Sequence, residues 1–319
     1  MPVKNVPVVI AYGAWDVAPW LARFRTADPA RSFIVMDRPD MPLPDQYYLT
    51  CWKPDPAVFR RTPQPLLISS PGAGVDHIMK ANPPPHIPVI RIVDPDLSGR
   101  MMEYVVLHAL YHFRQMCDFA ASQRKATWEQ RTQPATREVT VGLLGLGEMA
   151  LSSAAGLKAM GFQVIGWSRS AKPDLAIENF AGAEGLAPFL ARTDILVNLL
   201  PSTPETRGVI NATLIGLLKR GGPLGAPVLI NAGRGDAVND ADLVAALGSG
   251  ALRSASLDVF TVEPLAKDSP YWGLPNVVVT PHAAADSMPE SVVDCILGEI
   301  RRFEAGEPLQ CRADTGRGY

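Results

Sequence analysis

The chain has 319 residues, which is more than one hydrophobic core usually supports, so we expect two domains. Hydrophobic residues make up 47% of it and charged residues 19%, and its net charge of −2 lacks the basic excess that a nucleic-acid partner requires. Every apolar run is far shorter than the roughly 20 residues of a membrane span. We therefore predict neither a nucleic-acid partner nor a membrane partner.

The N-terminus and the cysteines indicate the compartment. The first ten residues are followed by Gly13, Trp15 and Asp16, which is too early for a signal peptide. The cysteines are scattered and form no Cys-x-x-Cys pair, so we expect neither a structural zinc site nor a disulfide framework. A cytoplasmic location fits this pattern best, and we predict no metal.

The first hundred residues contain short apolar runs separated by prolines. These runs predict strands at 6–11, 33–36, 47–52, 66–69 and 89–93. Helical candidates at 20–26 and 75–80 lie between some of them. Alternating strands and helices favour a small parallel α/β sheet.

Residues 99–125 have apolar side chains at helical spacing, with no proline or internal glycine. They predict one long helix that connects two domains. A polar stretch follows at 124–137 and contains Trp128. This tryptophan either anchors a second subunit, reaching toward its active site, or packs locally.

A second α/β series then begins. Its predicted strands are 139–144, 162–167, 194–200, 228–231, 255–259 and 277–280. Its predicted helices are 148–160, 186–191, 211–219 and 240–247. Six strands with intervening helices match a doubly wound, Rossmann-type domain. A last helix at 289–305 is expected to pack back on the first domain.

A glycine turn joins the first strand of this series to its helix, in the order Gly145, Leu146, Gly147. The first glycine permits a tight turn, and the second lets the backbone approach a pyrophosphate at the helix N-terminus. Ala150 occupies the third position, where a small residue allows close packing. A glycine turn without a ligand is the alternative, but the strand–turn–helix context favours a dinucleotide site.

The end of the second strand indicates which dinucleotide binds. NAD sites usually carry an acid there for the ribose 2′-hydroxyl. This chain instead has Ser168, Arg169, Ser170 and Lys172, whose hydroxyls and cations suit a 2′-phosphate. Asp174 comes too late to replace the acid. The alternative is a solvated basic turn, but the pattern favours NADP.

Three chemically complementary residues follow later strands of the series, namely Arg234, Glu263 and His282. Open α/β sheets bind ligands outside the carboxyl ends of their strands, where all three are expected. Taken singly, they read equally well as a solvated cation, a surface acid and a loop cap. Together they form a set that is able to bind an anion and transfer a proton.

The sequence resembles the D-isomer-specific 2-hydroxyacid dehydrogenases, most of all their glyoxylate/hydroxypyruvate reductase A branch. The resemblance spans nearly the whole chain. It is carried by residues 72–76, 102–104, the glycine turn at 145–150, 167–169, 231–235, 263–265, 281–284 and the terminal 317–319. Ala150, where many relatives have a third glycine, and the Ser70-Pro71 pair before the first glycine loop are departures.

The resemblance implies a Rossmann-type cofactor domain inserted in a smaller flavodoxin-like α/β catalytic domain, with the active site in the cleft. We accordingly predict a substrate domain at 1–99 and 285–319, and a dinucleotide domain at 100–284. The resemblance also implies a homodimer formed through the cofactor domain. The cofactor contacts that we predict beyond the turn and the basic loop are Glu148, Met149, Leu200, Pro201, Thr206, Ala232, Asp258 and His282.

The expected reaction is NADPH-dependent reduction of a small 2-oxo acid, such as glyoxylate or hydroxypyruvate. Arg234 would hold the substrate carboxylate and polarise the C2 carbonyl. His282 would supply the proton, with Glu263 orienting it and favouring its charged form. Asp258 is expected to brace Arg234 or the cofactor ribose. Further substrate contacts are assigned to Trp52 as a pocket wall and to backbone donors of a nest-like loop, Ala73, Gly74 and Val75.

Two other functions remain open at this point. One is an NAD-dependent D-2-hydroxyacid dehydrogenase for a bulkier acid, which the Ser168-Arg169 turn argues against. The other is a non-enzymatic corepressor that senses dinucleotide, which the intact Arg234, Glu263 and His282 set argues against. His108 and His112 have the spacing of a metal pair, but a packed or interface role is favoured.

Overall fold

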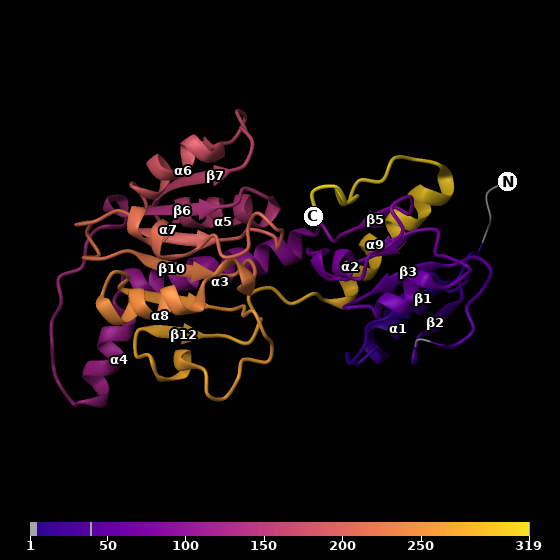
Figure 1. Ribbon diagram of the computed structural model, residues 1–319, viewed down its shortest axis with the longest axis horizontal. Coiled ribbons are helices and arrows are strands. Elements are labelled where there is room, and N and C mark those ends of the chain that lie inside the picture. Colours follow the sequence, from indigo (N-terminus) through magenta and orange to yellow (C-terminus); the bar gives the residue numbers. More distant parts are fainter. Residues whose placement is uncertain (1–4, 39, 319) are drawn as a thin grey trace. The chain divides into compact units, whose positions relative to one another are not determined.

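The computed structural model describes residues 5–38 and 40–318, which form two compact units (Figure 1). Unit 1 contains the chain up to Leu97 and again from Ser287, and unit 2 contains Ser98–Asp286. Unit 2 is therefore an insertion in unit 1. Tyr319, part of the resemblance noted above, lies outside the described residues. None of the described helices is both long enough and apolar enough to cross a membrane.

Unit 1 is built on one parallel sheet, whose described strands are β1 (Val8–Ala11), β2 (Phe33–Val35), β3 (Tyr48–Cys51), β4 (Ile68–Ser69) and β5 (Val89–Ile90). They are ordered β2-β1-β3-β4-β5, which is the flavodoxin-like order. The associated helices are α1 (Ala18–Ala27), η1 (Pro56–Arg60), α2 (Asp76–Lys80) and α9 (Pro289–Ala305). The expected flavodoxin-like fold of the smaller domain is confirmed.

Helices α1 and α9 pack on each other, although they lie at opposite ends of the sequence. The apolar side of α9 is buried through Val292, Ile296 and Ile300. A largely buried ion pair joins the Arg31 guanidinium to the Glu304 carboxylate at 2.8 Å. The last helix thus packs back on the first domain, as the sequence predicted.

Unit 2 contains a larger parallel sheet. Its described strands are β6 (Thr140–Leu144), β7 (Gln163–Ser168), β8 (Glu178–Ala181), β9 (Ile195–Asn198), β10 (Val228–Asn231), β11 (Ser254–Leu257) and β12 (Val277–Val279). They are ordered β12-β11-β10-β9-β6-β7-β8, the doubly wound arrangement with one added strand. The strand order reverses between β6 and β9, and ligands bind at the carboxyl ends beside such a switch point.

Helices cover both faces of this sheet. One core packs α3 (Pro95–Phe113) and α5 (Glu148–Ala159) on the strands. The other core packs α6 (Gly182–Leu190), α7 (Ala212–Leu217) and α8 (Asp240–Ser249) on the opposite face. Burial on both faces explains why strands such as β9 and β10 are continuous apolar runs rather than alternating ones.

The single helix predicted over 99–125 is wrong. The structure has two helices, α3 ending at Phe113 and α4 (Met116–Arg124), with Gln115 in the left-handed conformation at φ 58° between them. The break is stabilised by tertiary contacts: the Gln115 side chain donates to the Thr132 carbonyl, and Arg253 binds Asp118 on α4. Because these contacts come from distant segments, helical spacing alone does not reveal them.

The six strands predicted for unit 2 omit β8. Its residues, Glu178–Ala181, are polar or half-buried and lie at the edge of the sheet, so they lack the apolar run that indicates a buried strand. The helix that follows is also longer than predicted, since α6 begins at Gly182 rather than at 186. The strand lacks an apolar run because it lies at the sheet edge, whereas the first turn of α6 contains Gly182 and Gly185, which have low helix propensity.

Two histidines of α3 are buried against strand β11. His108 Nδ1 lies 2.6 Å from the Ser256 hydroxyl, and His112 Nε2 lies 2.8 Å from the same hydroxyl. His112 Nδ1 also bonds the Ser254 hydroxyl at 2.8 Å. Burial lowers the pKa of His108 to about 4 and that of His112 to about 3. Both side chains are therefore neutral links between α3 and β11.

These histidines predict a loss of stability in mild acid. Between the unfolded pKa of about 6.5 and the lowered folded values, only the unfolded chain binds the protons, so stability falls as pH falls. Each histidine contributes up to about 1.4 kcal/mol per pH unit. We expect the thermal unfolding midpoint of unit 2 to be lower at pH 5 than at pH 7. His112→Asn should make this difference smaller. Replacing the exposed His86 with Asn is the control, and equal drops in both variants would contradict the assignment.

Candidate active site

The glycine turn lies at the carboxyl end of β6, beside the switch point. Gly145 has φ +99°, a conformation that side chains rarely adopt, and its N–H donates to the Trp167 carbonyl at 2.9 Å. A Cβ atom at this position would lie 3.2 Å from the Leu199 carbonyl oxygen. The turn is therefore held between β7 and the loop after β9, and it directs the chain into α5.

The N-terminus of α5 fits a dinucleotide pyrophosphate. Gly147 is its N-cap, and no described side chain caps the helix there. A Cβ at Gly147 would meet no described heavy atom within 4 Å, so the surface above the first amides is open. Glu148 is exposed, Met149 half-buried and Ala150 buried in the core below. Open backbone N–H groups at the positive end of a helix are an anion site.

The basic loop after β7 packs onto this turn. The Lys172 ammonium donates to the Leu146 carbonyl at 2.6 Å, which joins the two segments. The Ser168 hydroxyl is buried and donates to the Ser170 carbonyl at 2.8 Å, so it stabilises the loop itself. Arg169 and Ser170 are exposed at the loop tip. Of the four predicted phosphate contacts, these two are the most accessible.

Arg169 also lies within electrostatic range of the loop that follows β9. The pKa of the exposed Glu205 is lowered, first by a hydrogen bond from Thr203 and to a smaller degree by the positive charge of Arg169. In that loop the Thr206 hydroxyl donates to the Pro201 carbonyl at 2.6 Å and accepts from the Thr203 amide at 2.8 Å. Thr206 therefore braces the turn that was predicted to contact the cofactor.

The loops after β9 and β10 are joined by a pair of buried asparagines. Asn198 Nδ2 donates to Asn231 Oδ1 at 2.8 Å, and Asn198 Oδ1 accepts from the Leu200 amide at 3.2 Å. Leu200 and Ala232 are buried, so any cofactor contact there would come mainly from the backbone. Sequence reasoning gave these asparagines no role. The sequence feature that could have revealed them is an asparagine at the end of each of two apolar strands.

Arg234 lies in the loop after β10, half-buried, and its Nη1 donates to the Gly233 carbonyl at 2.8 Å. The next residue, Gly235, contacts the loop after β11 so closely that a Cβ there would lie 1.9 Å from the carbonyl carbon of Phe260. Only glycine fits this contact. The loop that carries Arg234 is therefore packed directly on the loop that carries Glu263.

Glu263 and His282 form the central pair of the site. His282 Nδ1 lies 2.9 Å from Glu263 Oε2 and 3.1 Å from Oε1, and the imidazole is 42% exposed while the carboxylate is 25% exposed. Glu263 Oε1 also accepts from the Phe260 amide at 3.2 Å. Since the carboxylate occupies Nδ1, the other ring nitrogen, Nε2, is the one placed to exchange a proton with a ligand.

Asp258, at the end of β11, is 1% exposed and holds the His282 loop in place. Its carboxylate accepts from the Thr280 hydroxyl at 2.7 Å, the Ala283 amide at 2.8 Å and the Ala284 amide at 3.0 Å. Sequence analysis assigned Asp258 to Arg234 or to the cofactor ribose instead. The observed bonds assign it to the loop, because that loop brings two backbone donors to a buried carboxylate. A contact with Arg234 or with the cofactor ribose stays a prediction.

The predicted substrate loop belongs to unit 1. Its Ser70 hydroxyl accepts from the Gly72 amide at 3.1 Å and donates to the Gly74 carbonyl at 2.8 Å. The Ser70 departure thus fixes the loop and occupies the amide of Gly72, just before the predicted contacts Ala73, Gly74 and Val75. Trp52 is half-buried, and a Cβ at Gly72 would lie 3.1 Å from its ring. Trp52 therefore forms a wall against the loop.

The remaining loop residues differ in exposure. Ala73 and Gly74 are half-buried, whereas Val75 is 1% exposed and its side chain belongs to the core of unit 1. The side chain of Val75 is therefore structural, and only its backbone remains available for the predicted contact. No group of three or more metal-binding side chains occurs within the described residues.

The chemistry of unit 2 follows from this arrangement. Five neighbouring strand ends carry, in spatial order, an anion-binding turn, a braced loop, a guanidinium, a carboxylate and an imidazole. Such a set is able to bind a dinucleotide along the sheet edge, hold a small carboxylate and transfer a proton. The Tyr104 hydroxyl on α3 lies 2.8 Å from the Thr280 hydroxyl, which donates to Asp258. Helix α3 therefore also supports the loop that carries His282.

Comparisons with known proteins agree with this chemistry. A family profile described as D-isomer specific 2-hydroxyacid dehydrogenase, NAD binding domain, matches residues 106–284. The chain is 38% identical over 318 residues to a glyoxylate/hydroxypyruvate reductase A of Citrobacter koseri, an alignment that covers 98% of this chain and 99% of the relative.

Solved structures are similar over nearly the full length. An NADPH-dependent glyoxylate/hydroxypyruvate reductase of Sinorhizobium meliloti, in complex with NADP and sulfate, is 42% identical with a TM-score of 0.92, covering 99% of this chain and 100% of that one. A D-isomer specific 2-hydroxyacid dehydrogenase of Xanthobacter autotrophicus, in complex with NADPH and MES, is 37% identical with a TM-score of 0.93 and the same coverage.

The bonds of Asp258 predict that Asp258→Asn destabilises unit 2. An amide at this position replaces one acceptor with a donor and leaves a buried backbone N–H without its partner, which costs about 1–3 kcal/mol. We expect the thermal midpoint of unit 2 to fall accordingly. Asp268→Asn, which changes an exposed acid of the same unit, is the control. Equal midpoints for the two variants would show that Asp258 does not hold the loop.

Proposed function

Since this chain belongs to the D-isomer-specific 2-hydroxyacid dehydrogenase family, we propose that it reduces small 2-oxo acids, such as glyoxylate and hydroxypyruvate, to 2-hydroxy acids with NADPH. The observation that carries the proposal is the Glu263–His282 pair at 2.9 Å. The loop that carries Glu263 packs on the loop that carries Arg234. Residues 100–284 serve as the dinucleotide domain, and residues 1–99 with 285–319 serve as the substrate domain. NADPH oxidation with glyoxylate, hydroxypyruvate and a branched 2-oxo acid tests the proposal, which fails if none of them is reduced.

The cofactor, when bound, supplies the hydride that C2 of the substrate accepts. Arg234 offers two parallel donors to the substrate carboxylate and C2 oxygen. As negative charge develops on that oxygen, His282 Nε2 donates the proton to it. Glu263, bonded to Nδ1, keeps the ring oriented for this transfer. The loop of unit 1 with Ala73, Gly74 and Val75 contributes backbone donors to the carboxylate, and Trp52 limits the size of the acid.

NADP preference follows from the loop after β7, where Ser168–Lys172 contain two cations and no acid. The pyrophosphate is assigned to the amides above Gly147, and the 2′-phosphate to Arg169 and Ser170, with Lys172 close by through its bond to the glycine turn. The further cofactor contacts are assigned to Glu148, Met149, Leu200, Pro201, Thr206 and Ala232.

The enzyme is further assigned to the cytoplasm and to a homodimer formed through unit 2. All four cysteines lie among the described residues and are free thiols, as a reducing compartment favours. Apolar side chains are exposed along α3, α4 and the segment after them, with Leu107 at 60%, Met116 at 42% and Trp128 at 94%. Such a surface suits a second copy of the chain.

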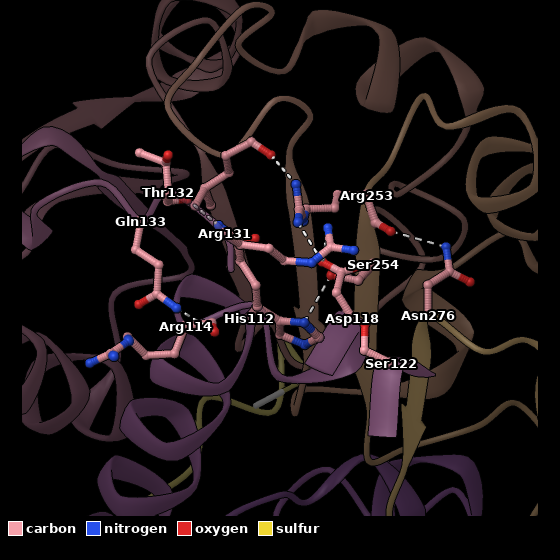
Figure 2. Close-up of polar contacts among 12 residues, drawn as sticks. His112, Arg114, Asp118, Ser122, Arg131, Thr132, Gln133, Arg253, Ser254 and Asn276 are labelled. Carbon is pink, nitrogen blue, oxygen red and sulfur yellow. Dashed lines mark hydrogen bonds and ion pairs between the residues drawn. The ribbon is translucent and has the colours of Figure 1, made fainter. Parts of the chain in front are cut away.

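Ion pairs and hydrogen bonds hold the segment that carries Trp128. Arg253 donates to Asp118 at 2.6 Å, and Arg131 lies 3.9 Å from Asp118 (Figure 2). Arg131 also lies 2.8 Å from Glu129. Beside it is a hollow of about 1070 Å³ lined by Phe119, Ser122, Gln123 and residues 126–132. A held segment with an exposed tryptophan supports a role in contacting the partner subunit.

The first prediction from this proposal concerns the cofactor. Arg169→Asp places a negative charge where the 2′-phosphate is assigned, and it removes a charge-assisted hydrogen bond of about 1.5–3 kcal/mol. We expect kcat/KM for NADPH to fall by about tenfold or more, with NADH much less affected. Arg220→Asp, at an exposed position of the same unit, is the matched control. If Arg169→Asp lowers kcat/KM equally for NADPH and NADH, the 2′-phosphate is bound elsewhere.

The second prediction concerns proton transfer. His282→Ala removes the general acid and is expected to lower kcat by about 10² or more, while NADPH binding measured by fluorescence titration is largely kept. Glu263→Gln keeps the shape but removes the charge on Nδ1, so kcat should fall by about tenfold. An unchanged kcat in Glu263→Gln would remove Glu263 from the mechanism.

The third prediction concerns the oligomeric state. Light scattering at micromolar concentration is expected to give twice the mass of the chain. Leu107→Asp, which places a charge on the exposed apolar face of α3, should shift the mass toward that of a single chain. Leu217→Asp alters an exposed leucine on α7 and serves as the control. A monomer in the unaltered protein would overturn the homodimer.

A further inference from the structure

Two thiols of unit 1 lie in contact, and neither is among the residues assigned to the reaction. Cys295 is on α9 and Cys311 lies in the segment after that helix, and their sulfur atoms are 4.0 Å apart. Both are half-buried, as is Cys117 of unit 2, whereas Cys51 is 0% exposed. A disulfide requires the two sulfurs to move about 2 Å closer, to a separation of about 2.05 Å.

The backbone around Cys311 is fixed on both sides. Its N–H donates to Glu299 on α9 at 3.0 Å, and the Gln310 N–H donates to the same carboxylate oxygen at 2.9 Å. Its carbonyl accepts from the Arg91 amide, just beyond β5, at 3.0 Å. Glu299 is one helical turn after Cys295, so the contact between the two sulfurs is built by the fold rather than by a mobile end of the chain.

The two thiols are electrostatically different. The hydrogen bond with Cys295, followed by a backbone hydrogen bond and the charge of Arg91, lowers the pKa of Cys311, whereas burial and the charge of Glu299 oppose that shift. That same hydrogen bond, together with burial, raises the pKa of Cys295. With the two sulfurs in contact at 4.0 Å, these directions favour Cys311 as the thiolate of the pair and Cys295 as the thiol that holds the proton. This is the asymmetry of an attacking and a resolving cysteine.

We propose that Cys295 and Cys311 form a dithiol clamp that closes reversibly to a disulfide on reaction with a peroxide. The Cys311 thiolate attacks the peroxide oxygen, so an S–O bond forms, the O–O bond breaks and hydroxide leaves as water after taking a proton. Cys295 sulfur then attacks the Cys311 sulfenic acid: the S–S bond forms, the S–O bond breaks, and the Cys295 proton leaves with the hydroxyl as a second water. Peroxide is reduced by two electrons and the two thiols are oxidised.

Closure ties the segment after α9 to that helix. The same segment pairs with β5 through Ile90 and Arg312, and the Ile92 amide beyond β5 donates to the Gly72 carbonyl of the substrate loop at 3.1 Å. The disulfide therefore fixes a strand pairing that lies one hydrogen bond away from that loop. The clamp is a property of unit 1 alone and does not depend on the proposed reductase activity.

The test is treatment of the full-length protein with hydrogen peroxide, followed by peptide mapping without reduction. The expected product is an intramolecular Cys295–Cys311 peptide that disappears with dithiothreitol. Cleavage by a protease within residues 306–313 should become several-fold slower after oxidation. Absence of that linked peptide, or linkage between two chains instead, overturns the proposal.

Variants distinguish the clamp from general thiol oxidation. In Cys295→Ala the resolving thiol is missing, so a dimedone-type reagent should trap a sulfenic acid on Cys311, whereas the unaltered protein should give little adduct. Cys117→Ala, which removes the other half-buried thiol, is the matched control and should still form the disulfide. Thermal midpoints show that each variant is folded. Equal trapping on Cys117 and Cys311 in Cys295→Ala would contradict the assigned asymmetry.

Discussion

The buried carboxylate of Asp258 is the constraint on which the site depends. Removing a charged carboxylate from water is costly unless it is fully hydrogen-bonded, and here one hydroxyl and two backbone amides satisfy it. These bonds hold the chain just after His282, which itself adopts a left-handed conformation at φ 57°. A histidine in that conformation persists only where its surroundings fix it, and here the result is an imidazole directed at Glu263.

Strand β11, which directly precedes Asp258, is fixed along its length by other polar contacts. Arg253, just before the strand, binds Asp118 of α4, and Ser254 and Ser256 bind the two buried histidines of α3. One strand thus connects the helices that carry the exposed apolar surface to the loop that carries His282. Neutral histidines suit this role, because both ring nitrogens of His112 and Nδ1 of His108 make hydrogen bonds without the cost of a buried charge.

Sequence patterns predicted the features that rest on local periodicity and on residue type. Continuous apolar runs revealed the parallel strands, and the glycine turn and the Arg234, Glu263 and His282 set fell at strand ends as expected. Features that rest on distant partners were missed. The break at Gln115 depends on Thr132 and Arg253, strand β8 pairs without an apolar run, and the role of Asp258 depends on amides that follow it by 25 and 26 positions.

The cofactor loop illustrates why residue type alone does not assign a contact. Ser168 and Lys172 have suitable donors, but one bonds the Ser170 carbonyl and the other bonds the Leu146 carbonyl. Their bonds instead build the loop and join it to the glycine turn, so that the two anion-binding segments are positioned as one piece. Under the proposed assignment, selectivity for a 2′-phosphate would rest mainly on the exposed loop tip, and affinity for the pyrophosphate on the helix below it. The two properties should therefore be separable by substitution, although Lys172 and the bond from Gly145 to Trp167 hold the two segments together.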